Sequence, residues 1–233
     1  DWKAHGWVDM RAAIAVSSDV YFYEVGGGFE DQIGLGISKI DKYLTQFGLA
    51  QTTGIDLPNE AIGYIATPIW KEKNFPDDPD WRIGDTYHTV IGQYGTQVTP
   101  VAAARWTSAI ANGGKLPELS VVLGGKRITQ NIDIPNDDWT VVREGMRQAV
   151  TNGIASALYF PQVAVAAKSG TAELGTTKSA VNSWITGFFP YKEPRYAFAV
   201  VMEHGPAVNT VGATYVMNRT LSWMINNTPE YLK

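Results

Sequence analysis

The sequence contains no cysteine in 233 residues and only three histidines. The lack of cysteine excludes disulfides, thiolate metal sites and a cysteine nucleophile, and it is compatible with both a reducing and an oxidising compartment. Runs of about 18 consecutive apolar residues are also lacking, so no membrane-spanning helix is predicted within the chain. Residues Asp1 to Lys3 have no feature of a signal peptide. We therefore expect a further segment of the protein to precede them.

The three histidines offer no independent catalytic site. His5, His88 and His204 are far apart in the sequence, and no Gly-x-Ser-x-Gly hydrolase signature accompanies them. Asp1 and Asp9 lie near His5, which in principle allows a metal site, but His-x-x-x-His spacing and cysteine ligands are both missing. We expect each histidine to be a packing or surface residue, and we expect no metal and no cofactor.

Charge of one sign is not concentrated anywhere along the chain. Lys and Arg number 19 and Asp and Glu number 23, which gives a formal net charge of -4 without runs of like charge. Nucleic acid is therefore excluded as an expected partner. Hydrophobic residues make up 45% of the chain, with 8 Trp, 11 Tyr and 8 Phe, which is typical of a folded protein. The length is near the upper limit for one core, so we expect one domain with room for two lobes.

The first half of the sequence predicts helices and long loops. Apolar residues recur at helical spacing in residues 8–25, where the polar run from Ser17 to Asp19 predicts a turn between two helical pieces. A second apolar stripe predicts a helix over residues 37–47, and Gly48 can take the left-handed closing position. Residues 52–96 are rich in Gly, Pro and Asp and are predicted to form long surface loops.

The second half predicts two helices followed by a sheet. Thr99 and Pro100 favour a helix start, and Asp138 is predicted to cap a second helix that ends near Asn152. Short runs rich in Val, Ile, Phe, Tyr and Trp predict three strands, at residues 163–167, 183–189 and 196–202. The last two strands are joined by a turn at residues 191–194, so they are predicted to be antiparallel.

Both faces of the predicted sheet need covering. The strand at residues 196–202 is apolar on both faces, and a final amphipathic segment at residues 212–226 can cover one of them. The sequence therefore predicts an α/β (α+β) fold in which an antiparallel sheet is covered by helices on both faces, with a mainly helical lobe beside it.

One motif whose residues could form a binding or catalytic site follows the first predicted strand. Lys168 supplies a positive charge, Ser169 and Thr171 supply hydroxyl donors, and Gly170 allows a ligand backbone to approach closely. Together these four residues can bind a carboxylate. As an isolated tetrapeptide, however, the motif is more often a solvated lysine at a strand end followed by a glycine turn.

A second motif lies about 150 residues earlier. Ser17 and Asp19 belong to the predicted interhelical turn, where Ser and Asp commonly act as helix caps. A Ser-x-Asp motif followed later by Lys-Ser-Gly-Thr on a strand resembles the second and third active-site motifs of the penicillin-recognising serine enzymes.

Further segments extend this resemblance over nearly the whole chain. They are Thr53 to Pro58, Gly84 to Thr86, Ile91 to Gln93, Thr99 with Pro100, and Trp184 to Pro190. The chain is similar to class B penicillin-binding proteins. Asp19 and Ser169 are more like the elongation-type transpeptidases of that class than the division-type, which tend to carry Asn and Thr there. One departure is Tyr94, which follows Gly92 and Gln93 where the family more often has Gly-Gln-Gly.

The first motif of the family is missing. Neither Ser-x-x-Lys nor Thr-x-x-Lys occurs in the 233 residues, and in the family this motif precedes Ser-x-Asn or Ser-x-Asp. We expect residues 1–233 to be a partial transpeptidase domain of the penicillin-recognising, β-lactamase-like fold. The nucleophile segment, a pedestal and a membrane anchor are then expected upstream of Asp1. A degenerate homologue that has lost catalysis is the alternative.

The resemblance implies three catalytic residues, Ser17, Asp19 and Lys168. Ser17 would relay a proton between the missing lysine and the leaving amine, and Lys168 would hold this network and the positive potential of the site. Asp19 would add an acceptor where the family often has Asn.

The resemblance also implies a substrate-binding strand made by Ser169, Gly170 and Thr171. Ser169 and Thr171 would bind the terminal carboxylate of the substrate. The backbone N–H of Thr171 would be one of two oxyanion donors, each typically contributing about 3 kcal/mol to the transition state.

The implied activity is peptidoglycan D,D-transpeptidation through a serine acyl-enzyme, which β-lactam antibiotics would trap. The implied partners are peptidoglycan stem peptides, β-lactams and a membrane glycosyltransferase that contacts regions outside this chain. The implied location is the periplasmic face of the bacterial inner membrane, with an N-terminal anchor outside this chain. A serine β-lactamase and a non-catalytic β-lactam sensor or scaffold remain alternatives, which acyl-enzyme lifetime and turnover would separate.

Overall fold

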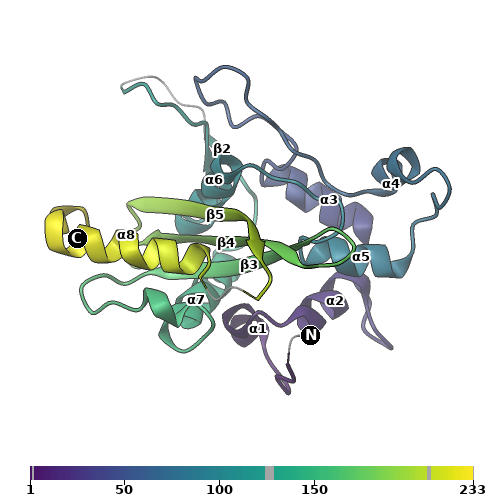
Figure 1. The fold of residues 1–233 in the computed structure, drawn as a ribbon, viewed down its shortest axis with the longest axis horizontal. Helices are drawn as coiled ribbons and strands as arrows, with labels where there is room; N and C mark the ends of the chain where they lie inside the picture. The colour runs from purple at the N-terminus through teal and green to yellow at the C-terminus, as the bar shows by residue number, and fades with distance from the viewer. Residues whose placement is uncertain (2, 124–128, 209–210, 233) are drawn as a thin grey trace. The chain divides into compact units, whose positions relative to one another are not determined.

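A computed structural model describes residues 1, 3–123, 129–208 and 211–232 of the chain (Figure 1). The chain folds into two compact units. The first unit comprises Asp1–Ala4, Ser18–Ala102 and Glu118–Arg127, and the second comprises His5–Ser17, Ala103–Pro117 and Ile128–Lys233. In the part of the chain that the structure describes, no helix combines the length and the hydropathy needed to cross a membrane.

The first unit is helical. Its helices are α2 (Asp19–Gly27), α3 (Ile37–Gln46), α4 (Pro68–Asn74) and α5 (Ile83–Val90). Helices α2 and α5 pack closely because Gly26 has no Cβ, which would otherwise lie 2.7 Å from a methyl group of Val90. The Tyr87 hydroxyl then donates to the carbonyl of Gly28 at 2.6 Å.

The prediction of loops throughout residues 52–96 is wrong, because α4 and α5 lie within them. Local signals for both helices are present in the sequence. The Thr67 side chain caps α4 with Pro68 in the first turn, and Asp85 accepts from the backbone of Arg82 to cap α5. The prediction missed these capping signals because it was based on the abundance of Gly, Pro and Asp in residues 52–96.

A buried ion pair ties α4 to α5. Lys71 is 3% exposed, and its Nζ donates to Asp85 Oδ2 at 2.8 Å and to the carbonyl of Asp80 at 2.7 Å. Burial by itself would raise the pKa of Asp85, but hydrogen bonds from Lys71 and from the backbone of Arg82 outweigh it and lower that pKa. Both charges are therefore compensated inside the unit.

Tyr94, the extra residue between Gln93 and Gly95 relative to the Gly-Gln-Gly pattern, lies within an aromatic cluster. Its backbone is left-handed, with φ of 73°, a region that glycine adopts more readily. Its ring centroid lies 5.3 Å from that of Trp70, 6.0 Å from Phe75 and 6.1 Å from Trp81. Aromatic packing therefore compensates for the backbone conformation at this position.

The second unit contains the sheet. Its helices are α1 (Met10–Val16), most of α6 (Pro100–Ala111), α7 (Asn136–Thr151) and α8 (Ala213–Asn227), with short 3-10 helices at Ser156–Leu158 and Pro229–Leu232. Strands β3 (Ala166–Leu174), β4 (Ala180–Phe189) and β5 (Tyr196–Pro206) form one antiparallel sheet in the order β3-β4-β5. A separate antiparallel pair is formed by β1 (Lys115–Pro117) and β2 (Thr129–Asn131).

Helices cover both faces of the three-stranded sheet, as the sequence predicts. Ile185 of β4 is fully buried in a cluster with Met217 and Leu221 of α8, and Figure 1 shows α8 running roughly along the direction of the strands. Phe188 points to the opposite face because side chains alternate along a strand, and the guanidinium of Arg143 on α7 lies 5.5 Å from its ring centroid. The α/β fold class is therefore confirmed.

Two predicted boundaries in this unit are wrong. The helix α7 begins at Asn136 with Pro135 as its N-cap, so Asp138 lies in the first turn instead of capping the helix. Strand β3 begins at Ala166 and continues to Leu174, so the Lys-Ser-Gly-Thr motif lies inside the strand and not after it. Pairing with β4 extends β3 through this polar sequence, which local β propensity does not favour.

We predict that Leu221→Ala lowers the free energy of unfolding by about 3 kcal/mol, because this fully buried side chain would leave a cavity between α8 and the sheet. Thr220→Ala, at the exposed neighbouring position, should change it by less than about 0.5 kcal/mol. Chemical denaturation of both variants checks the expectation. Equal effects would contradict the assignment of this helix face to the core.

Candidate active site

Ser17 ends helix α1 in an unusual backbone conformation. It is the C-cap residue, with φ of 56° and ψ of 57°, in the left-handed region. Its N–H bonds back to the carbonyl of Ile14 at 3.4 Å. Residues other than glycine seldom adopt this conformation, and they are enriched at functional sites where surrounding contacts maintain it.

Lys168 of β3 contacts Ser17 although 151 residues separate them in the sequence. Its Nζ donates to Ser17 Oγ at 2.7 Å and to the backbone carbonyl of Ser169 at 2.6 Å. Both side chains are half-buried. Lys168 pairs with Thr186 in the register of β3 and β4, so the lysine extends from a regular strand and not from a loose end.

This contact is suited to moving a proton. A hydroxyl that accepts a hydrogen bond from an ammonium group can donate its own proton to a different group. The ammonium also stabilises negative charge that develops on the serine oxygen, and charge-assisted hydrogen bonds are about twice as strong as neutral ones. The pair can therefore relay a proton, which is the role implied for Ser17 and Lys168.

The other two residues of the Ser17 to Asp19 run serve helix α2 of the first unit. Ser18 is buried as the N-cap of α2, accepts from the N–H of Tyr21 at 3.4 Å, and donates to Asp1 Oδ2 at 3.1 Å. Asp19 is the first residue of α2, where its charge favours the positive end of the helix dipole. The capping function predicted for this run is confirmed for Ser18, and a catalytic role for Asp19 stays a prediction.

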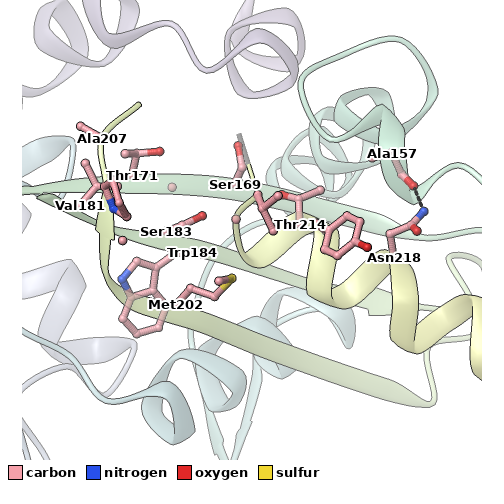
Figure 2. A pocket seen from close by; sticks show the side chains of 16 residues that line it. Ala157, Ser169, Thr171, Val181, Ser183, Trp184, Met202, Ala207, Thr214 and Asn218 are labelled. Atoms are coloured by element: carbon pink, nitrogen blue, oxygen red, sulfur yellow. Dashed lines mark hydrogen bonds between the residues drawn. The ribbon is translucent and has the colours of Figure 1, made fainter. Parts of the chain in front are cut away.

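Ser169, Gly170 and Thr171 line a pocket of about 530 Å³ in the second unit. Figure 2 shows Ser169, Thr171 and Ser183 on the strands and Thr214 on α8 around it. Among the described residues, neither Ser17 nor Lys168 lines this pocket. Alternation along β3 explains the separation, because Lys168 and Ser169 point to opposite faces of the sheet. The substrate-binding roles of Ser169, Gly170 and Thr171 stay predictions.

Sequence reasoning missed the residues that complete this pocket. Ser183 pairs with Thr171, and the sequence pattern marks it only as the start of an apolar strand. Thr214, Tyr215 and Asn218 lie on α8 and carry no local signal of a site. Only Ser183, a hydroxyl in an otherwise apolar run, could have drawn attention.

In the ranges that the structure describes, no group of three or more His, Asp or Glu side chains is arranged to hold a metal ion. The chemistry available at the site is that of hydroxyls, backbone amides and the Lys168 ammonium. This set fits acyl transfer by general acid–base and electrostatic catalysis.

Known proteins are similar to this chain in sequence and in fold. The chain matches the penicillin binding protein transpeptidase domain over residues 1–221. It is 30% identical over 231 residues to the peptidoglycan D,D-transpeptidase MrdA of Acinetobacter baumannii, covering 88% of this chain and 33% of that protein. It is 31% identical over 242 residues to MrdA of Escherichia coli strain K12, covering 91% of this chain and 37% of that protein. The chain therefore spans well under half the length of these relatives.

A solved structure gives the same result for the fold. The penicillin-binding protein PBP2 of Helicobacter pylori, solved in complex with MreC, matches with a TM-score of 0.82 at 32% identity, over 98% of this chain and 42% of that one. The residues matched by the family include Ser17, Lys168 and the Ser169 to Thr171 strand. The chain belongs to the family of penicillin-binding protein transpeptidase domains.

Proposed function

We propose that the protein containing this chain is an elongation-type peptidoglycan D,D-transpeptidase, which cross-links stem peptides and is acylated by β-lactams. The observation that carries the proposal is the 2.7 Å hydrogen bond from Lys168 Nζ to Ser17 Oγ. It joins the second and third motifs of the family, which are 151 residues apart in the sequence. The proposed activity requires a Ser-x-x-Lys nucleophile in a segment upstream of Asp1.

The proposed reaction has two steps. In the first, the upstream serine oxygen attacks the carbonyl carbon of the penultimate D-Ala, its proton passes through the site to the leaving amine, and the terminal D-Ala departs. In the second, the nitrogen of an amine of another stem peptide bonds to the ester carbon, the bond from that carbon to the serine oxygen breaks, and one amine proton passes to the serine oxygen, which leaves a new amide. Ser17 and Lys168 relay the protons, and Asp19 supports this network.

The same family match supports the proposed binding roles. Ser169 and Thr171 hold the carboxylate of the terminal residue, Gly170 leaves room for the peptide backbone, and the N–H of Thr171 donates to the oxyanion. Two hydroxyl groups and one backbone N–H on the same strand supply these donors.

The proposed partners are peptidoglycan stem peptides, β-lactams and a membrane glycosyltransferase that contacts regions outside this chain. The proposed location is the periplasmic face of the bacterial inner membrane, with an anchor upstream of Asp1. Relatives named peptidoglycan D,D-transpeptidase support the proposal of a peptidoglycan partner.

The test uses the full-length protein with a synthetic stem peptide ending in D-Ala-D-Ala and a second stem peptide as amine donor. Mass spectrometry should detect the cross-linked dimer together with released D-Ala. A stable penicilloyl adduct on the upstream serine is also expected. Rapid hydrolysis of that adduct without dimer formation would instead identify a β-lactamase, and an adduct without any peptide turnover would identify a sensor.

A further inference from the structure

Helix α1 is too short to hold Ser17 in place by itself. It has 7 residues, Met10–Val16, and an isolated helix of that length is not stable in water. Ser17 follows it with a left-handed backbone, a conformation that persists only where neighbouring contacts maintain it. The position of Ser17 therefore depends on the element against which α1 packs, and that element is α7 (Figure 1).

The turn after α7 supplies a hydrogen bond that the end of α1 lacks. The last carbonyl groups of a helix have no partner within it. The N–H of Ser17 bonds to the carbonyls of Ala13 and Ile14. The carbonyl of Ala15 instead accepts from the N–H of Ile154 at 3.1 Å. Because Ala15 is buried, loss of this bond would leave a carbonyl group without a partner and away from water, which is costly.

The absence of a side chain at Gly153 makes this contact possible. A Cβ there would lie 2.8 Å from the Cα of Ala149 and inside the contact distance of the Ala15 carbonyl oxygen. The turn itself is fixed, since the N–H of Ala155 bonds to the carbonyl of Ala149 at 2.9 Å and both alanines are fully buried. A larger residue at position 153 would therefore displace the end of α1 from α7.

The same helix also holds the strand that carries Lys168. The guanidinium of Arg147 donates from Nη1 to the carbonyl of Val165 at 2.7 Å, three residues before Lys168. Beyond this point the strand is paired with β4. Helix α7 and its final turn thus contact the backbone shortly before Ser17 and shortly before Lys168. A change at Gly153 would move only the Ser17 side, so it would alter the distance between the two side chains.

We propose that Gly153 is a positioning residue for the proton relay, because it admits the Ala15 carbonyl to the N–H of Ile154 and so places Ser17 Oγ beside Lys168 Nζ. This inference rests on the proposed function. Gly153 acts through Ser17 and not on the substrate. A shift of about 1 Å in the serine oxygen would stretch the 2.7 Å bond beyond hydrogen-bonding distance. Misplacement of that size can lower a rate about 100-fold.

The experiment measures acylation of the full-length protein by a fluorescent penicillin. Gly153→Ala should lower the second-order rate constant of the folded fraction, which circular dichroism gives, by about 10- to 100-fold. Gly114→Ala is the matched control near the start of α7, where a Cβ would lie 2.9 Å from the carbonyl oxygen of Ile132 and 2.9 Å from the Trp139 ring. It should lower stability and leave the rate constant of the folded protein within about threefold.

A double-mutant cycle separates positioning from a general structural effect. In Ser17→Ala the oxygen that Gly153 positions is gone, so adding Gly153→Ala should change the remaining rate by less than about twofold. A loss that only followed from lower stability would be the same in both backgrounds. Equal losses in both backgrounds would overturn the inference, and so would a loss in Gly114→Ala as large as that in Gly153→Ala.

A second variant decides the inference if Gly153→Ala does not fold. Replacing Ile154 by its α-hydroxy acid changes the N–H to an ester oxygen, which removes the hydrogen bond to Ala15 and keeps the side chain. This change should lower the rate constant about three- to tenfold, and only when Ser17 is present. An unchanged rate constant in the ester variant would overturn the inference. A wild-type protein that penicillin does not acylate would instead refute the proposed function itself.

Discussion

Residues 1–233 expressed alone are expected to remain unlabelled by a fluorescent penicillin, whereas the same protein with its upstream segment should be labelled stoichiometrically. The reason is chemical, because no Ser-x-x-Lys occurs in these residues and the proposed function needs an activated serine. Ser17 already has a lysine 2.7 Å away, so it is the competing nucleophile within the chain. Gel fluorescence and peptide mapping of the adduct check both forms.

Two controls make this result informative. Thermal unfolding of the isolated chain must show a cooperative transition, so that lack of labelling is not lack of folding. Replacing the upstream serine by alanine in the longer protein should abolish labelling. Stoichiometric acylation of the isolated chain at Ser17 or Ser169 would refute the assignment of the nucleophile to an upstream segment.

Lys168→Ala in the full-length protein should lower the second-order rate constant of acylation by a β-lactam by one to two orders of magnitude. The substitution removes the charge-assisted hydrogen bond to Ser17, and such bonds typically contribute about 1.5 to 3 kcal/mol. Folding should change far less, by about 1 kcal/mol or less, because the half-buried side chain contributes little packing. Acylation kinetics and thermal unfolding of the same variant give the two numbers.

Lys178 provides a matched control in the connection between β3 and β4. It pairs with Glu173 at 2.6 Å, and both side chains are largely exposed, so the pair contributes little to stability. Lys178→Ala should leave the acylation rate unchanged. If Lys168→Ala also changes acylation by less than about threefold, Lys168 is a surface residue of the strand and not part of the site.

Much of the fold could be predicted from patterns within short stretches of the sequence. The break between α1 and α2 at Ser17, the helix ending before Gly48, the start of α6 after Thr99 and the alternation in β5 all depend on neighbouring residues. Helices α4 and α5 were not predicted, because the loop-like composition of residues 52–96 was given more weight than the capping residues of the two helices. The extension of β3 through Lys168 could not be predicted, because pairing with a strand later in the sequence determines it.

The sequence alone determined the residue types of the site: a serine at a helix junction, and a lysine, two hydroxyls and a glycine in one run. Only the tertiary structure decided which of them meet. It brings Ser17 to Lys168 across 151 residues, because α1 packs on α7 and α7 packs on β3. It also separates Lys168 from the pocket lined by Ser169, because consecutive side chains on a strand point to opposite faces. That pocket needs β3, β4, β5 and α8 together, so no local pattern in the sequence could have predicted it.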